Sequence, residues 1–326
     1  MHDRYQRQIN YLRISVTDRC NLRCVYCMPA EGIKHIPHSE ILTMEEIVTV
    51  VKAGVLVGIK KVRLTGGEPL VRGGILDLLR NLRDIPEIDD IALTTNGILL
   101  GEMASDLKAA GLKRVNISLD TLKPAKFHRI TRYGNLNLVR SGIAAALQNE
   151  LGPVKINTVA IRGFNDDELV DLARLTLDKP LHVRFIELMP IGTSDAWSKG
   201  RFISNQEVRE LITRTLGNLE EEKNILGSGP ARYSRFPGAP GTIGFISAVS
   251  NHFCAACNRL RLTATGQLRP CLFSGREIDL KQALRAGAGT GELAGIFKEA
   301  IYAKPDCHDL AVGWQKDDRI MSQIGG

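Results

Sequence analysis

Short runs of β-forming residues alternate with amphipathic helical stretches from Tyr11 to about Pro190. Strand–helix alternation at this spacing predicts βαβ units and a parallel sheet. About six units fit, fewer than the eight of a closed TIM barrel. The expected strands are Tyr11–Thr17, Lys61–Thr65, Ile91–Thr95, Arg114–Leu119, Val154–Ile161 and His182–Leu188. The expected helices between them are Met44–Gly58, Gly74–Asp84, Leu100–Ala110, Leu136–Leu151 and Asp166–Leu177.

The expected strands differ from the continuous apolar runs of a parallel sheet that is covered on both faces. Polar and apolar residues alternate in them, so one face of the sheet is polar in at least four strands. The polar positions are Arg13, Ser15, Thr17, Arg63, Thr65, Asn116, Ser118, Lys155 and Asn157. An antiparallel sheet with one wet face would alternate too, but helices separate these runs. We therefore expect an open, partial (β/α)6 TIM-like barrel whose polar lumen is a binding cavity.

The pattern changes after Pro190. One more helix is expected at Asn205–Leu216, and a Gly/Pro-rich stretch, Gly227–Gly244, predicts a loop or short hairpin region. Two β-like runs, Thr242–Val249 and Arg259–Ala264, follow, and helical patterns from residue 279 to residue 304 come last. We expect a partial barrel over residues 1–225 and a C-terminal extension over residues 226–326 that closes its open mouth.

Composition favours a soluble cytoplasmic protein. Hydrophobic residues make up 44% and charged residues 24% of the chain, as in ordinary globular proteins. No apolar run reaches the roughly 18 residues of a membrane span, and no secretory signal follows Met1. The net charge of +7 comes without a basic tail and with only 5% aromatic residues. We therefore expect neither nucleic acid nor membrane as a partner, and favour a small polyanionic substrate.

The first three cysteines, Cys20, Cys24 and Cys27, have the spacing C-x3-C-x2-C and directly follow the first expected strand. A [4Fe–4S] cluster normally takes four cysteines, so three thiolates on one loop would leave one iron open to another ligand. A zinc site with a distant fourth ligand is the alternative, although zinc usually takes two C-x2-C pairs or Cys/His pairs.

This cysteine loop resembles the defining motif of the radical S-adenosylmethionine (SAM) enzymes. The segment Gly66-Gly67-Glu68-Pro69 follows the second strand and resembles the family's GGEP segment, which contacts the methionine amino group of SAM. The resemblance implies that the open iron binds SAM, whose reductive cleavage gives a 5′-deoxyadenosyl radical. It also implies that SAM contacts Tyr26, Gly67, Ser118 and Met189.

The second triplet, Cys254, Cys257 and Cys271, has the spacing C-x2-C-x13-C. By spacing alone zinc remains open here, with His252 within reach as a further ligand. Arg259 and Arg261 follow at once on one face of a β-run, and guanidinium groups suit phosphate oxygens. The seventh cysteine, Cys307, matches neither triplet, and we expect it to be a free thiol.

The segment from Gly244 to Cys271 and the terminal Gly325-Gly326 resemble the GTP 3′,8-cyclases of molybdenum cofactor biosynthesis, one family of radical SAM enzymes. The resemblance implies a second [4Fe–4S] cluster on the second triplet. It also implies a catalytic role for Gly325 and Gly326. The positions implied around GTP are Arg13, Arg63, Thr94, Lys155, Arg259, Leu260 and Arg261.

The activity implied by the resemblance is conversion of GTP to (8S)-3′,8-cyclo-7,8-dihydroguanosine 5′-triphosphate. Such an enzyme needs a reducing electron donor, passes its product to cyclic pyranopterin monophosphate synthase and is compatible with a homodimer. Two alternatives remain. Another radical SAM enzyme with an auxiliary cluster, such as a peptide-modifying one, would lack the Arg-x-Arg pair and the terminal double glycine. A zinc-stabilised nucleic-acid-binding module would contain zinc and be colourless.

Overall fold

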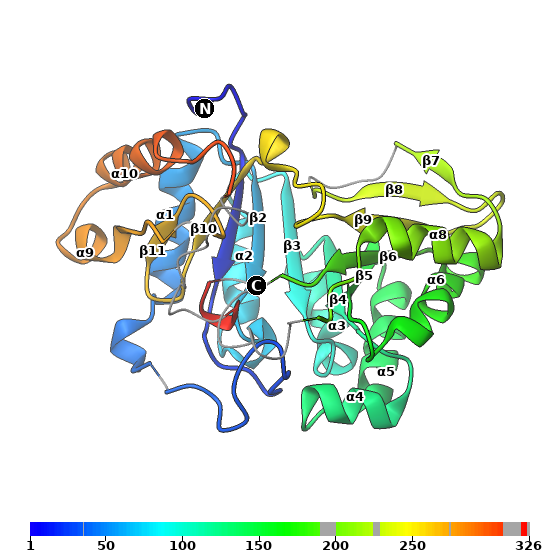
Figure 1. Cartoon of the computed structure of the whole chain (residues 1–326). Coiled ribbons are helices and arrows are strands. Elements are labelled where there is room, and N and C mark those ends of the chain that lie inside the picture. The colour runs from blue at the N-terminus through cyan, green and yellow to red at the C-terminus, as the bar shows by residue number, and fades with distance from the viewer. Residues whose placement is uncertain (35, 190–199, 224–228, 274, 309–320, 325–326) are drawn as a thin grey trace.

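The six expected strands all form, and each is parallel to the next along the chain. The computed structural model describes the chain except for residues 35, 190–199, 224–228, 274, 309–320 and 325–326 (Figure 1). The strands are β1 (Tyr11–Ser15), β2 (Lys61–Thr65), β3 (Asp90–Thr95), β4 (Arg114–Ser118), β5 (Val154–Ala160) and β6 (Leu181–Glu187). Their ends lie within two residues of the predicted ones.

The helices that connect these strands are α1 (Met44–Val55), α2 (Ile75–Arg83), α3 (Leu100–Ala109), α4 (Pro124–Thr131), α5 (Leu136–Gln148) and α6 (Leu169–Asp178). Helix α4 is not among the expected helices, because its eight residues give only about two turns of periodicity. Toward the C-terminus lie α8 (Asn205–Leu216), α9 (Leu280–Arg285) and α10 (Thr290–Tyr302). The helical pattern over residues 279–304 is thus two helices, separated by a turn at Gly287.

The C-terminal region extends the sheet at both edges. Strand β9 (Thr242–Ile246) pairs parallel with β6, and β10 (Arg259–Leu262) pairs parallel with β1. Antiparallel strands continue outward on each side: β8 (Arg232–Arg235) and β7 (Glu220–Glu222) beyond β9, and β11 (Gln267–Arg269) and β12 (Ile278–Asp279) beyond β10. In the described residues the twelve strands run from β12 to β7 without closing. The fold is therefore the predicted open, partial TIM-like barrel.

The alternation in the strands has the predicted cause. Apolar strand residues such as Leu12, Val62 and Leu64 are fully buried and pack in one large core with helix residues such as Ile47 and Leu78. Helices lie around the outside of the curved sheet (Figure 1). Because successive side chains point to opposite faces, the polar positions turn to the inside of the barrel.

The expected division at residue 225 stays a prediction, and strands from both sides of it belong to the same sheet. Over the described residues, no helix has the length and apolar character needed to cross a membrane.

Candidate active site

A cavity of about 320 Å³ occupies the inside of the barrel. Side chains from β1 to β6 and from β10 line it, together with the loops that follow the strands. All six cysteines of the two triplets line this one cavity: Cys20, Cys24, Cys27, Cys254, Cys257 and Cys271. The chain thus brings together two groups of thiols that are far apart in the sequence.

The first cysteine loop follows β1 and rests on α4. The backbone N–H groups of Arg23 and Val25 donate to the carbonyls of Thr131 and Ile130 at 3.0 and 2.9 Å. At the near end of the loop, the Cys20 Sγ accepts the Leu22 N–H at 3.4 Å. The loop therefore keeps its course through backbone bonds to the rest of the barrel.

Asn96, at the end of β3, is a residue that the sequence patterns did not single out. Its Nδ2 donates to the Asn21 Oδ1 at 2.7 Å and to the Cys20 Sγ at 3.8 Å. Its own backbone N–H donates to the Glu68 carboxylate at 2.7 Å. Glu68 is buried, and burial raises the pKa of its carboxyl to about 7. This chain of bonds fixes the first cysteine loop against the loop after β2.

Gly67 lets these two loops touch. A Cβ on Gly67 would lie 2.3 Å from the Arg19 carbonyl oxygen, closer than any side chain can approach. The Gly67 N–H donates to the Thr17 carbonyl at 2.8 Å, and the Glu68 N–H donates to the Arg19 carbonyl at 2.8 Å. The Gly–Gly pair therefore serves close packing here, and Gly67 itself lines the cavity.

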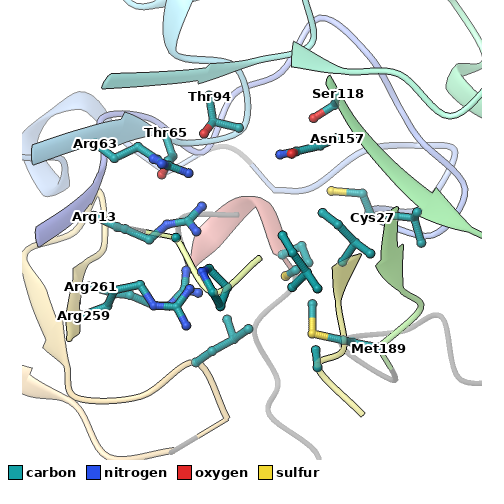
Figure 2. A pocket seen from close by; sticks show the side chains of 18 of the residues that line it. Arg13, Cys27, Arg63, Thr65, Thr94, Ser118, Asn157, Met189, Arg259 and Arg261 are labelled. Carbon is teal, nitrogen blue, oxygen red and sulfur yellow. The ribbon is translucent and has the colours of Figure 1, made fainter. Parts of the chain in front are cut away.

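The four positions expected around SAM all line the cavity: Tyr26, Gly67, Ser118 and Met189. Figure 2 shows Ser118, Cys27 and Met189 on one side of the pocket. The Tyr26 hydroxyl donates to the Asp120 Oδ2 at 2.6 Å. Burial raises the pKa of Asp120 to about 6. Asp120 also lines the cavity but was not predicted; its only sequence signal is its place just after β4.

The partly buried thiols of the first triplet fit a cluster. Burial raises the pKa values of Cys20 and Cys24, the latter well above its ordinary value. Metal ligation supplies the positive charge that turns such thiols into thiolates. Within the described residues, no three Cys, His, Asp or Glu side chains are grouped to hold a single metal ion. In a [4Fe–4S] cluster, each cysteine ligand binds a different iron and the thiols surround a cube.

The second triplet has a different electrostatic environment. Cys254 begins a 3-10 turn, and the Cys257 N–H donates to the Cys254 carbonyl at 3.1 Å. Burial raises the pKa of Cys257, but the charges of Arg259 and Lys304 outweigh it and bring the pKa to about 6. The Arg259 Nη2 lies 3.8 Å from the Cys257 Sγ. This thiol is therefore prepared for ligation as a thiolate. None of the seven cysteines, all of which lie in the described residues, forms a disulfide, and Cys307 is exposed.

Arginines dominate the side of the cavity next to the second triplet. Strand register places Arg13 of β1 between Arg63 of β2 and Arg261 of β10. Burial, together with repulsion from neighbouring arginines, lowers the pKa values of Arg63 and Arg261 to about 10 and about 9. Figure 2 shows Arg13, Arg63, Arg259 and Arg261 on the side of the pocket opposite Met189.

The cavity is strongly cationic. Its basic lining residues among those described are Arg13, Arg63, Arg184, Arg259, Arg261 and Lys304. Asp120 is the only Asp or Glu among the described lining residues. Buried like charges at this density are costly unless an anion offsets them. The Nε atoms of Arg63 and Arg184 and the Asn157 Oδ1 are buried without a hydrogen-bond partner. The site therefore suits a polyanion with further polar groups.

The predicted GTP positions do not all line the cavity. Arg13, Arg63, Thr94, Arg259 and Arg261 do, whereas Lys155 and Leu260 are not among the described lining residues.

Leu260 is in register with Leu12 and belongs to the outer apolar core. Lys155 is buried on β5 with its Nζ 5.6 Å from the Tyr233 ring centre. Burial and the charges of Arg184 and Arg114 lower its pKa to about 6. Arg184 and Asn157 line the cavity without having been predicted as GTP positions, although Asn157 belongs to the predicted polar face.

Gly325 and Gly326 lie outside the described residues. The chain just before them reaches the arginine side of the cavity. Met321 lines the cavity, and the Arg261 Nη1 donates to the Ile324 carbonyl at 3.5 Å. Ile324 is itself buried.

Two protein families match consecutive parts of the chain. Residues 14–176 match the Radical SAM superfamily, and residues 181–310 match the family described as Molybdenum Cofactor Synthesis C. Over 326 residues and the full length of both proteins, the chain is 61% identical to the GTP 3′,8-cyclase of Pelotomaculum thermopropionicum. It is 58% identical, again over both full lengths, to the GTP 3′,8-cyclase of Desulforamulus reducens.

Solved structures share the fold. Streptococcus suis SuiB bound to S-adenosylmethionine superposes with a TM-score of 0.57 at 15% identity, over 93% of this chain and 77% of SuiB. Methylornithine synthase superposes with a TM-score of 0.50 at 17% identity, over 64% of this chain and 62% of that one. At these identities the likeness supports the fold alone. The full-length relatives are decisive for the family: the chain belongs to the GTP 3′,8-cyclase family of radical SAM enzymes.

Proposed function

We propose that this chain converts GTP to (8S)-3′,8-cyclo-7,8-dihydroguanosine 5′-triphosphate, the first step of molybdenum cofactor biosynthesis. One observation carries the proposal: two cysteine triplets and a group of buried arginines line the same cavity. Family membership at 61% identity over the whole chain supports it.

The side of the cavity near the first triplet would hold SAM. Cys20, Cys24 and Cys27 would bind a [4Fe–4S] cluster, and Tyr26, Gly67, Ser118 and Met189 would contact SAM. When bound, the cluster and SAM would supply the radical chemistry that removes the hydrogen from C3′ of the GTP ribose. The chain's part is to hold these groups at reacting distance, because a radical takes the hydrogen nearest to it.

The arginine side would hold GTP. Arg13, Arg259 and Arg261 would bind the triphosphate, since a guanidinium donates two parallel hydrogen bonds to phosphate oxygens. Arg63, Thr94, Lys155 and Leu260 are the further proposed GTP positions. The buried, mutually repelling arginines favour an anion more strongly than exposed ones would, because the surrounding protein screens charge less than water does.

Cys254, Cys257 and Cys271 would hold a second [4Fe–4S] cluster, which would supply an iron with an open coordination site for the nucleotide. We propose that Gly325 and Gly326 enter the cavity beyond Ile324, where residues without a Cβ can pass through a crowded site. The chain would act in the cytoplasm with a reducing electron donor, would pass its product to cyclic pyranopterin monophosphate synthase, and is compatible with a homodimer.

The peptide-modifying alternative predicts no Arg-x-Arg pair beside the second triplet. Arg259 and Arg261 occupy that position and line the cavity. No observation favours this alternative over the nucleotide reaction.

Anaerobic incubation with SAM, a reductant and GTP tests the proposal. The hydrogen taken from C3′ is replaced after cyclisation by one electron and one proton, so the product has the mass of GTP. We expect a new nucleotide that chromatography separates from GTP at equal mass, formed together with 5′-deoxyadenosine. Deoxyadenosine without any new nucleotide, from protein carrying both clusters, would contradict the proposal.

A further inference from the structure

We propose that Arg7 and Lys304 are positioning residues for the auxiliary cluster. These two buried cations, here called the carbonyl clamp, tie together the chain segments that carry Cys254, Cys257 and Cys271. The inference rests on the proposed function, since it takes those three thiols as cluster ligands. Neither cation belongs to a motif that the sequence patterns singled out.

Arg7 lies in the segment before β1 and is only 6% exposed. Its Nε donates to the Asp3 Oδ2 at 2.6 Å. The other carboxylate oxygen, Asp3 Oδ1, accepts the backbone N–H groups of Tyr5 and Arg7, both at 2.9 Å. A closed turn with a buried ion pair therefore fixes the direction of the guanidinium.

The rest of the guanidinium faces carbonyl oxygens around the second triplet. The Arg7 Nη1 donates to the Cys254 carbonyl at 2.9 Å and to the Asp306 carbonyl at 2.8 Å. The Arg7 Nη2 donates to the Pro305 carbonyl at 2.6 Å. The Cys254 carbonyl also closes the turn to Cys257. A planar fork with donors in fixed directions suits such a set of acceptors.

Lys304 holds the other two cysteine segments. It follows α10 and is 3% exposed. Its Nζ donates to the Arg259 carbonyl at 2.9 Å and to the Pro270 carbonyl at 2.7 Å. Arg259 comes two residues after Cys257, and Pro270 directly precedes Cys271. Each of the three cysteine segments thus has a backbone carbonyl bound to one of the two cations.

The two cations form one unit. Pro305 and Asp306, whose carbonyls bind Arg7, directly follow Lys304 in the chain. Displacing either cation would therefore loosen the segment that positions the other.

Charge supports the same reading. A buried ammonium is costly unless negative charge lies near it. The Arg259 and Pro270 carbonyls that Lys304 binds are neutral, whereas ligation would make the neighbouring thiols of Cys257 and Cys271 anionic. Groups that hydrogen-bond and orient metal ligands typically change metal affinity or activity by about 10- to 100-fold when they are replaced. We expect effects of this size on the auxiliary cluster.

The test uses the full chain with Cys20, Cys24 and Cys27 replaced by alanine, which should carry the auxiliary cluster alone, with about four irons. The substitutions Arg7→Gln, Arg7→Lys and Lys304→Met are each introduced into this parent variant. Arg129→Gln and Lys298→Met are matched controls, because both residues are exposed. Iron release to a chelator is timed under anaerobic conditions, and the reduction potential of the cluster is measured by titration.

We expect iron release about 10- to 100-fold faster for Arg7→Gln and Lys304→Met than for the parent. Arg7→Lys should also release iron faster, because lysine keeps the charge but lacks the fork. Removing a cation should lower the reduction potential, since net charge near a cluster helps to set it. The two control variants should match the parent in both measurements.

A second background separates positioning from general loosening. With Cys254, Cys257 and Cys271 replaced by alanine, only the first cluster remains, and Arg7→Gln should leave its iron release unchanged. If Arg7→Gln accelerated iron release equally in both backgrounds, the clamp would be overturned and the proposed function would stand. The same would follow if Arg7→Gln and Lys304→Met released iron from the auxiliary cluster at the rate of the control variants. A first parent that binds no cluster would overturn the proposed second cluster, and this inference with it.

Discussion

Replacing Arg63 by methionine should weaken GTP binding and yet leave the ligand-free protein at least as stable as before. Arg63 is 6% exposed, and its Nε has no hydrogen-bond partner. Burial, with repulsion from Arg114, Arg184 and Arg259, lowers its pKa from 12.5 to about 10. At about 1.4 kcal/mol for each pKa unit, holding this charge at its buried position costs about 3 kcal/mol.

Methionine has a similar length, no charge and no donor to satisfy. In the ligand-free protein, the substitution should therefore raise the melting temperature by a few degrees or leave it unchanged. A hydrogen bond to a charged partner contributes about 1.5 to 3 kcal/mol, so the loss should raise the Kd for GTP by about 10- to 150-fold.

Anaerobic calorimetric titration with GTP measures the affinity, and a thermal melt without nucleotide measures the stability. Arg80→Met is a matched control, because Arg80 lies exposed on α2 with an ion pair to Asp77. A Kd within about threefold of the wild-type value would refute a role for Arg63 in binding the nucleotide. A melting temperature many degrees lower would refute the claim that the buried charge of Arg63 destabilises the ligand-free protein.

Four further predictions concern the clusters and the barrel. Cys24→Ala should abolish SAM cleavage, and deoxyadenosine above background would contradict the assignment of the first cluster. Cys271→Ala should still bind SAM, as measured by equilibrium dialysis, but should form no cyclised nucleotide; unchanged product formation would show that the second cluster is dispensable. Removing Gly325 and Gly326 should stop cyclisation while the protein keeps about eight irons, and normal turnover would exclude a role for them. Glu187→Gln should lower the free energy of unfolding by about 1 to 3 kcal/mol, as measured by chemical denaturation. The buried carboxylate accepts the backbone N–H groups of Asn205, Val249 and Ser250, and the amide nitrogen of glutamine cannot accept them. A change in the free energy of unfolding below about 0.5 kcal/mol would contradict this role.

The barrel could be predicted because its signal is local. Alternation within single strands places Arg13, Arg63 and Ser118 on one face and Leu12 and Val62 on the other, whichever strands pair. Strand ends also follow from short patterns, which is why the predicted bounds are close to the observed ones.

The pairing of the C-terminal strands could not be predicted in this way. No local pattern in Arg259–Leu262 predicts that this strand pairs with β1, which lies some 250 residues earlier in the chain. This pairing makes Arg261 a neighbour of Arg13. The resemblance implies a GTP position at Leu260, and no local pattern shows that its side chain belongs to the outer core. Likewise, Arg7 and Lys304 bind backbone carbonyls in the segments of the second triplet, and such contacts leave no trace in the sequence.

In the proposed reaction, a radical formed beside the first triplet meets the ribose of a nucleotide held by the arginines in the same cavity. The most direct measurement is the fate of deuterium from GTP labelled at C3′. We expect the 5′-deoxyadenosine formed during turnover to carry that deuterium. Deoxyadenosine that stays unlabelled while GTP is consumed would contradict it.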